Sequence, residues 1–260
     1  MGENWCAIYL SGTGNTEYCI KKFVHALDAD APMIAIEDIT ANVALKKFDF
    51  IVLGYPVQFS NAPIMVRDFI KSNATLWRGK KVFCIATMGA FSGDGAGCSA
   101  RILKKCGASI LGGLHLKMPD SVCDSKLLKK RREQNIKIIQ RAEEKIERTA
   151  DKIKRGKFPR EGLNGFSHIA GLFGQRLWFY GKTNKYSAQL KINHTLCIGC
   201  GTCISLCPMN NLEMKDNKAD AKKKCTMCYR CISKCPKKAI TLIGKEVVQQ
   251  HRMEDYICDN

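Results

Sequence analysis

"CIGCGTCISLCP" (residues 197–208) recurs 28 positions further along the chain as "CTMCYRCISKCP" (225–236). Both stretches space four cysteines as C-x₂-C-x₂-C-x₃-C and place a proline after the last cysteine. An isoleucine and a serine also match between the copies, at Ile204 and Ser205 in the first and Ile232 and Ser233 in the second. Such a match indicates the internal duplication of one structural unit. The stretch therefore predicts a small domain made of two related halves.

Clustered cysteines of this kind hold either zinc or iron–sulfur clusters. Structural zinc sites usually combine two C-x₂-C pairs across a longer loop. The run C-x₂-C-x₂-C-x₃-C-P is instead typical of bacterial proteins with two [4Fe–4S] clusters, in which the fourth cysteine of each run ligates the other cluster. We therefore predict one cluster held by Cys197, Cys200, Cys203 and Cys235, and a second held by Cys225, Cys228, Cys231 and Cys207. The lysines around the second block would offset the negative charge of the clusters.

The composition favours a folded protein of the cytoplasm. The 260 residues are 45% hydrophobic, and the first residues show neither a basic segment nor a long apolar run. A cytoplasmic chain keeps its 15 cysteines reduced, which agrees with metal sites rather than disulfides. We expect no transmembrane span.

The positive charge is concentrated in the middle of the chain. The net charge is +18, and residues 121–192 contain 18 basic but only 7 acidic side chains. A surface of this kind either steers an acidic redox partner or forms the solvated face of a helix, and we favour the second interpretation. Aromatic residues do not alternate with the basic ones as in single-strand binding surfaces, so we expect no nucleic-acid partner.

The amino-terminal half alternates short apolar runs with helical patterns. This alternation predicts a doubly wound α/β domain with a parallel sheet of five strands. The expected strands are 5–10, 33–36, 50–56, 82–88 and 110–118. In such sheets ligands bind at the carboxyl ends of the strands. The loops at these ends are "SGTGNT" (11–16), "GYPVQFS" (54–60) and "TMGAFSGDG" (87–95).

The first of these loops has the composition of a phosphate site. It matches neither GxxxxGK[ST] nor GxGxxG. Hydroxyl groups at Ser11, Thr13 and Thr16 and the amide of Asn15 precede a helix, whose amino terminus can hold a single phosphate group without a cationic side chain. An ordinary capped turn is the alternative.

"SGTGNT" resembles the phosphate-binding loop of flavodoxins, and the whole chain resembles the flavodoxin–ferredoxin fusion proteins of anaerobic bacteria and archaea. The resemblance implies an FMN cofactor whose phosphate is held by Ser11, Thr13, Gly14, Asn15 and Thr16. It also implies that the second and third loops flank the isoalloxazine ring, through Pro56, Val57, Thr87, Met88 and Gly89, with Tyr55, Phe59 and Phe91 as candidates for stacking on it. Flavodoxins are usually acidic, whereas this domain is mildly basic, so the partner preference of the family is not carried over.

The resulting domain organisation has four parts. We expect a flavodoxin-like domain (1–155), a docking or linker segment (156–192), a small α+β ferredoxin-like domain with two [4Fe–4S] clusters (193–244), and a mobile carboxy-terminal tail (245–260). A periodic apolar stripe predicts a long helix within 122–155. For the apolar stretch 162–186 we favour docking between the domains or covering of a redox centre. Peripheral membrane contact by 163–180 is the alternative.

Two hypotheses for the function follow. In the first, the chain is a cytoplasmic electron-transfer protein that passes electrons between two [4Fe–4S] clusters and FMN, linking a low-potential donor to a redox partner protein. In the second, it is a ferredoxin-dependent flavin reductase that acts directly on a small molecule. The chain contains no recognisable nicotinamide-binding domain, which argues against NAD(P)H as the direct electron donor.

Overall fold

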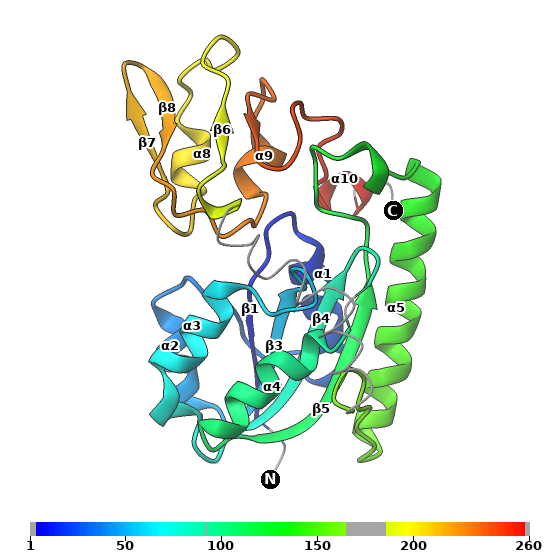
Figure 1. The fold of residues 1–260 in the computed structure, drawn as a ribbon. Helices are drawn as coiled ribbons and strands as arrows, with labels where there is room; N and C mark the ends of the chain where they lie inside the picture. Colours follow the sequence, from blue (N-terminus) through cyan, green and yellow to red (C-terminus); the bar gives the residue numbers. More distant parts are fainter. Residues whose placement is uncertain (1–3, 92, 165–185, 258–260) are drawn as a thin grey trace.

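The computed structural model describes residues 4–91, 93–164 and 186–257. The chain forms an α/β domain with a smaller, cysteine-rich domain stacked on one end of its sheet (Figure 1). The docking role expected for residues 162–186 concerns mainly residues 165–185, which lie outside the described residues.

The α/β domain contains the expected parallel sheet of five strands, in the order β2-β1-β3-β4-β5. Its strands are β1 (Trp5–Tyr9), β2 (Met33–Ala35), β3 (Phe50–Pro56), β4 (Lys81–Met88) and β5 (Ser109–Lys117). The strands lie close to their predicted positions because both faces of the sheet are covered, and strands buried on both faces are continuous apolar runs.

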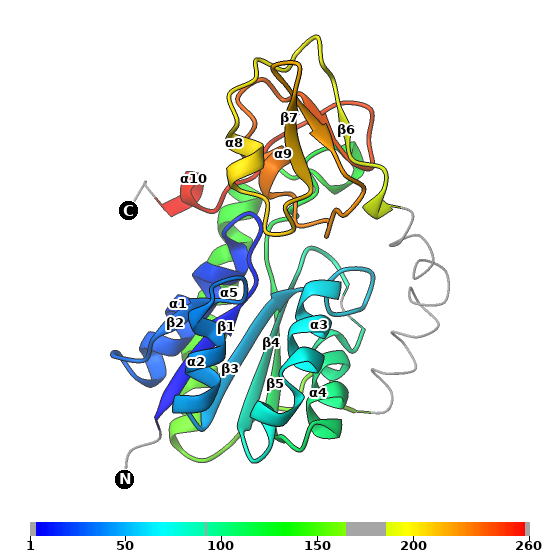
Figure 2. The same cartoon turned by 90° about the vertical axis from the view of Figure 1, so that its left-hand side faces the viewer.

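Helices cover both faces of this sheet (Figure 2). One hydrophobic core packs β1, β3 and β4 against α2 (Thr40–Lys47), α3 (Ile64–Ser72) and α4 (Gly95–Lys105). The other packs the opposite face against α1 (Asn15–Leu27) and α5 (Arg132–Lys154). Two short 3₁₀ helices, η1 (Ala74–Trp77) and η2 (Lys126–Leu128), lie in the connections.

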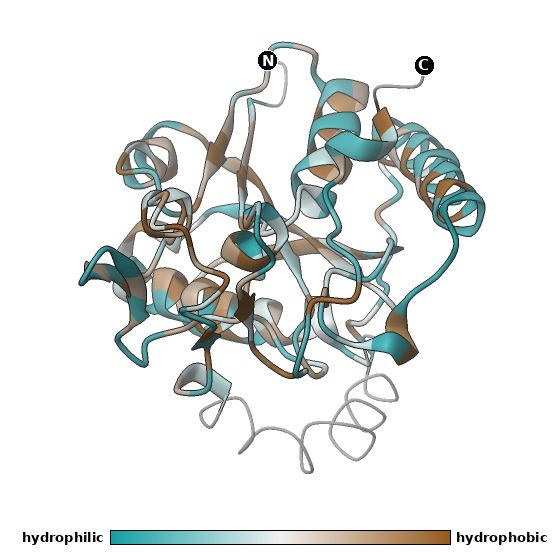
Figure 3. Cartoon of the chain, turned by 90° about the horizontal axis from the view of Figure 1, so that it is seen from above, coloured by the Kyte–Doolittle hydropathy of each residue, from teal (hydrophilic) through white to brown (hydrophobic). Residues whose placement is uncertain are grey.

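The long helix predicted within residues 122–155 begins later than the first residue of that range. α5 starts at Arg132, and residues 122–131 form a loop that includes η2. In this loop the side chain of Asp124 bonds to the cysteine-rich domain, and the carbonyl of Cys123 accepts from Val248 and Gln249 of the carboxy-terminal tail, which a helix would prevent. From Ile139 onward the predicted apolar stripe is buried, and α5 has a hydrophilic outer face and a hydrophobic inner face (Figure 3).

The cysteine-rich domain is a small α+β unit. Two antiparallel pairs of strands, β6 (Lys191–Ile192) with β9 (Ile240–Thr241) and β7 (Leu212–Lys215) with β8 (Lys218–Ala221), flank the helices α8 (Thr202–Ser205) and α9 (Arg230–Lys234). Three cysteine side chains of each block lie in or against its core, namely Cys197, Cys203 and Cys207 of the first and Cys225, Cys231 and Cys235 of the second. Over the described residues of the whole chain, every helix is too short or too polar to cross a bilayer.

The carboxy-terminal tail is packed, which corrects the expectation of a mobile segment. Residues 245–257 return to the α/β domain and end in the short helix α10 (Glu254–Ile257). His251 and Met253 are each only 3% exposed. The backbone N–H of Met253 donates to the carbonyl of Thr13 at 2.9 Å, and its side chain joins the core formed with α1 and α5. Apolar burial therefore holds the tail in place.

Candidate functional site

A cleft lies between the two domains, at the carboxyl ends of the strands. The α/β domain contributes the loops after β1, β3, β4 and β5, and the cysteine-rich domain contributes residues 227–229 and Ile243. The lining residues are Ser11, Gly12, Thr13, Asn15, Thr16, Pro56, Val57, Gln58, Phe59, Thr87, Met88, Gly89, Met118, Pro119, Asp120, Ser121, Val122, Met227, Cys228, Tyr229 and Ile243. The three loops singled out by the sequence thus meet in one place.

The loop after β1 has the features of an anion site. Gly14 precedes α1 in a left-handed conformation (φ 91°), and the first residues of the helix, Asn15 and Thr16, line the cleft, so the amino terminus of α1 lies where it can bind an anion. The hydroxyl of Ser11 is buried and has no hydrogen-bond partner among the described residues. Such a group normally has a partner, so it fits a site completed by a bound phosphate. Thr13 and Ser121 share a hydrogen bond of 2.8 Å at the rim.

Two polar side chains of the same loop are engaged elsewhere. Asn15 donates through Nδ2 to the carbonyl of Pro119 at 2.7 Å, and its Oδ1 lies 2.8 Å from His251 Nε2. The hydroxyl of Thr16 forms a hydrogen bond of 2.8 Å with that of Thr87. Hydroxyl groups can donate and accept together, so Thr16 keeps bonding capacity, whereas the side chain of Asn15 mainly braces the loop.

Most residues expected around the flavin ring line the cleft, but two do not. Pro56, Val57, Phe59, Thr87, Met88 and Gly89 are lining residues. Tyr55, by contrast, is fully buried, and its hydroxyl donates to the carbonyl of Gly95 at 2.7 Å. Phe91 lies outside the lining and is 47% exposed. Tyr55 was therefore a wrong candidate for stacking, whereas Phe91 stays a prediction. Tyr55 shares a sheet face with Ile51 and Leu53, since alternate residues of a strand point the same way.

The cysteine-rich domain contributes three lining residues that were not predicted from the sequence, Met227, Tyr229 and Ile243. Met227 and Tyr229 both have positive φ, 57° and 62°, a backbone conformation that residues other than glycine rarely adopt. The equivalent residues of the first block are Gly199 and Gly201, with φ 70° and 76°. The second block thus keeps strained backbone positions while replacing glycine with large side chains that face the cleft, a pattern associated with functional sites. Comparison of the two repeats would have revealed it.

The loop after β5 was also missed, and it brings a carboxyl group to the cleft. Burial raises the pKa of Asp120 above its usual range. Its Oδ2 lies 2.1 Å from the position that a Cβ on Gly89 would occupy, so Gly89 allows the two loops to approach. A carboxyl with a raised pKa takes up a proton more readily and can then donate a hydrogen bond to a ligand.

The eight cysteines of the two blocks form two groups. Cys197, Cys200, Cys203 and Cys235 line one small cavity, and Cys207, Cys225, Cys228 and Cys231 line another. Each cavity therefore combines three cysteines of one block with the last cysteine of the other. Within the described ranges, no three His, Cys, Asp or Glu side chains are close enough to share a single metal ion. Each cavity thus offers the four thiol groups that one [4Fe–4S] cluster requires.

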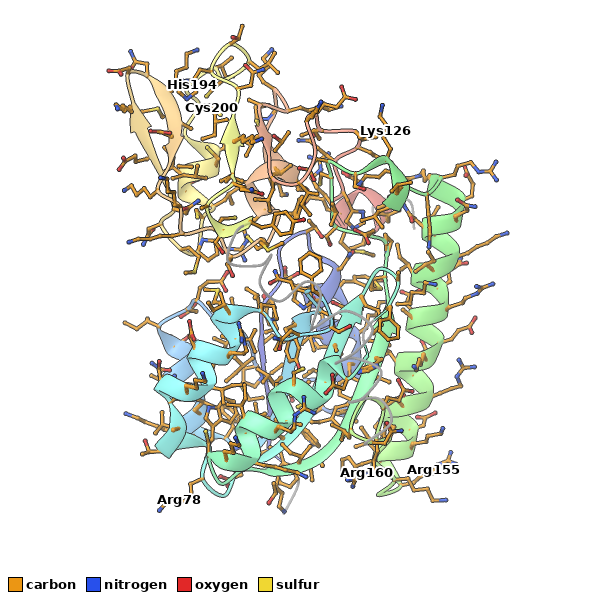
Figure 4. The ribbon with its side chains drawn as sticks, viewed as in Figure 1. Arg78, Lys126, Arg155, Arg160, His194 and Cys200 are labelled. Atoms are coloured by element: carbon orange, nitrogen blue, oxygen red, sulfur yellow. The ribbon has the colours of Figure 1, made fainter. Side chains whose placement is uncertain are left out.

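The two groups differ in environment. Cys200 is exposed and lies on the side of its domain away from the sheet (Figure 4), and a hydrogen bond with Thr202 lowers the pKa of its thiol. Burial raises the pKa of the Cys225 thiol to about 11. Cys228 lines both the second cysteine cavity and the interdomain cleft. Its carbonyl oxygen lies 1.8 Å from the position of a Cβ on Gly12, so only glycine permits this approach.

Polar contacts fix the two domains around the cleft. Arg230 donates to the carbonyl of Ser11 at 2.7 Å and pairs with Glu37 at 2.6 Å. Gln58 donates to the carbonyl of Thr226 at 2.9 Å. These contacts hold the second cysteine group against the loops after β1 and β3.

The architecture and the cleft define a flavodoxin-type domain joined to a dicluster ferredoxin domain. A family model described as flavodoxin domain matches residues 6–156, and one described as 4Fe-4S dicluster domain matches residues 189–254. The flavodoxin model covers more than half of the chain, and the chain belongs to this family, as a flavodoxin–ferredoxin fusion. The two domains imply FMN and two [4Fe–4S] clusters as cofactors.

Curated relatives match only part of the chain, and they include a putative electron transport protein and ferredoxins. The "Putative electron transport protein YsaA" of Escherichia coli is 33% identical over 69 residues, which are 24% of this chain and 44% of that protein. A ferredoxin of Pyrobaculum islandicum is 36% identical over 55 residues, 20% of this chain and 51% of that protein. The chain thus spans about half the length of these relatives.

Solved structures match the α/β domain. An archaeal flavodoxin is 17% identical, with a TM-score of 0.41 over 58% of this chain and 98% of the other. The two-electron reduced flavodoxin of Megasphaera elsdenii is 28% identical, with a TM-score of 0.39 over 54% of this chain and 98% of the other.

Proposed function

We propose that this protein transfers electrons between a low-potential donor and a redox partner protein by way of two [4Fe–4S] clusters and FMN. Bound FMN accepts one or two electrons, and each cluster exchanges one at a time. The observation that carries the proposal is the position of Cys228, which belongs to the second cysteine group and also lines the cleft beside Gly12.

Under this proposal the two cysteine groups are the cluster ligands, each with three cysteines of one block and the last of the other. The loop 11–16 holds the FMN phosphate, and the loops 54–60 and 87–95 together with Met227 and Tyr229 surround the ring. The domain limits are those expected above, except that residues 245–257 pack against the α/β domain.

The arrangement also gives an order to the two cysteine groups. The first group includes the exposed Cys200, and its neighbours Leu196 and Ile198 are exposed apolar side chains, 47% and 57% respectively. The second group adjoins the flavin cleft. A protein donor would therefore dock at the first group, and the second group would connect it to the cleft.

Rapid mixing of anaerobic protein with reduced ferredoxin tests this order. Cys200→Ala should remove the outer cluster and slow flavin reduction by ferredoxin at least tenfold, while light-driven chemical reduction of the flavin proceeds as in the unaltered protein. Iron counts and electron paramagnetic resonance verify that only one cluster is lost. Unchanged flavin reduction by ferredoxin in this variant refutes the order, and a preparation that binds neither flavin nor iron refutes the function itself.

One observation favours the second candidate, a flavin reductase that acts on a small molecule. Met88 lines the flavin cleft and also a separate basic groove behind it. Oxidation of the reduced flavin in proportion to a small added acceptor, with no partner protein present, would select this alternative.

A further inference from the structure

The basic groove lies between the sheet and α5, next to the flavin cleft. It has a volume of about 560 Å³. The loop after β4 and strand β5 form one wall, and α5 together with Lys130 in the preceding loop forms the other. The lining residues are Met88, Ala90, His115, Lys117, Lys130, Gln134, Lys137, Ile138, Arg141, Ala142 and Lys145.

Five of these residues are Lys or Arg and none is Asp or Glu. Lys145 is paired with Glu161 at 2.7 Å, and Lys130 interacts electrostatically with Asp120 at the flavin cleft. Within the part of the chain that the structure describes, Lys117, Lys137 and Arg141 form no ion pair. The groove therefore carries positive charge that neighbouring side chains do not neutralise.

The spacing of these charges weakens the helix that bears them. Lys137, Arg141 and Lys145 follow one another at four-residue steps on α5, so three cations lie on successive turns, about 6 Å apart along the helix axis. Like charges at this spacing destabilise a helix unless an anion lies across them, and Glu161 does so only for Lys145. Residues 165–185 contain no Asp or Glu and supply no such anion.

We propose that this groove binds a small organic phosphate with two or three linked phosphate groups. The step between the cations of α5 matches a short chain of negative charges, and Lys117 faces them from the sheet. Arg141 offers the forked donor geometry that suits phosphate oxygens. Ile138, Ala142 and Met88 provide an apolar floor for the organic part.

The groove adjoins the flavin cleft, so a ligand bound in it can affect the flavin. Because Met88 also lines the flavin cleft, a molecule bound in the groove contacts the loop that flanks the flavin ring. Binding should therefore change the visible absorption of the flavin. The proposal needs no electron transfer, so it can fail while the proposed function holds, and the reverse.

Isothermal titration calorimetry of the anaerobic, cofactor-loaded protein with inorganic tripolyphosphate, at constant ionic strength, tests the proposal. The unaltered protein should bind tripolyphosphate, and the double variant Lys137→Gln/Arg141→Gln should bind it at least about tenfold more weakly, since two charge-assisted contacts are lost. The matched control Lys152→Gln/Lys154→Gln removes two positive charges from the last turn of the same helix, outside the groove.

Three results would overturn the proposal. The first is absence of binding to the unaltered protein. The second is an equal loss of affinity in the groove variant and the control, which indicates unspecific attraction to a basic surface. The third is binding of polyglutamate without binding of tripolyphosphate, which indicates an acidic protein partner. Circular dichroism and flavin absorption establish that both variants are folded.

Discussion

Asp124 joins the two domains, and its removal should measure how much that junction contributes to stability. The carboxylate is only 4% exposed. Its Oδ2 accepts the backbone N–H groups of Leu242, Ile243 and Gly244 at 2.6, 2.9 and 3.1 Å, and its Oδ1 accepts the hydroxyl of Tyr229 at 2.9 Å. One side chain of the α/β domain therefore satisfies four donors of the cysteine-rich domain.

Asp124→Ala leaves three backbone donors without an acceptor in a buried region. Each such group costs about 1–3 kcal/mol, and partial access of water as the loop relaxes reduces the sum, so we expect a loss of about 3–6 kcal/mol. At about 2–4 °C per kcal/mol for a chain of this size, the unfolding temperature should fall by at least about 6 °C. Asp124→Asn is the matched control, because its amide oxygen can still accept from the backbone while its NH₂ group faces the oxygen of Tyr229.

Thermal unfolding of anaerobic protein, followed by circular dichroism at one fixed scan rate, provides the comparison. Loss of the flavin should precede global unfolding in Asp124→Ala, because Asp124 bonds to Tyr229, which lines the flavin cleft. The reasoning is refuted if Asp124→Ala and Asp124→Asn lower the unfolding temperature by the same amount.

Two further predictions concern the cysteine groups and the tail. Cys235→Ala should remove the cluster of the first block, seen as a change in the electron paramagnetic resonance of the reduced protein, and loss of the second block's cluster instead would disprove the cross-block ligation. Burial lowers the pKa of His251 from 6.5 to about 4, so the unfolded chain binds a proton at this residue between these values and the folded chain does not. Stability should therefore be complete above pH 6.5 and decline toward pH 4, and His251→Gln should flatten this decline in urea unfolding, while parallel pH profiles for both proteins would contradict it.

Local sequence signals predicted the sheet well because they are physically local. The run "FIVLGYP" is continuous and apolar since β3 is buried on both faces, and its limits agree with the strand. The start of α5 was not predictable, because residues 122–131 are held by contacts with residues more than 100 positions away, such as Leu242. The 3.6-residue period of apolar residues reports how α5 packs on the α/β domain, and it carries no information about contacts of residues 122–131 with the other domain.

The residues of the site likewise fall into those that local sequence predicts and those that it does not. The loop 11–16 could be selected from sequence because a strand, a tight loop and a helix follow each other directly. Tyr55 was misplaced because aromatic character alone does not show which face of β3 it occupies. His251 and Met253 were missed entirely, since nothing in residues 245–257 indicates that they return to the loop after β1.

That return has a consequence for how the cofactor is bound. Arg230 contacts the carbonyl of Ser11, Cys228 lies against Gly12, the N–H of Met253 bonds to Thr13, and His251 bonds to Asn15. Elements from the carboxy-terminal quarter of the chain thus contact four of the first five residues in the proposed phosphate loop. A ligand that orders this loop stabilises the docked arrangement of domains, and docking in turn stabilises the loop for the ligand, because the two equilibria share these contacts. FMN affinity and domain docking should therefore change together in any variant of this junction.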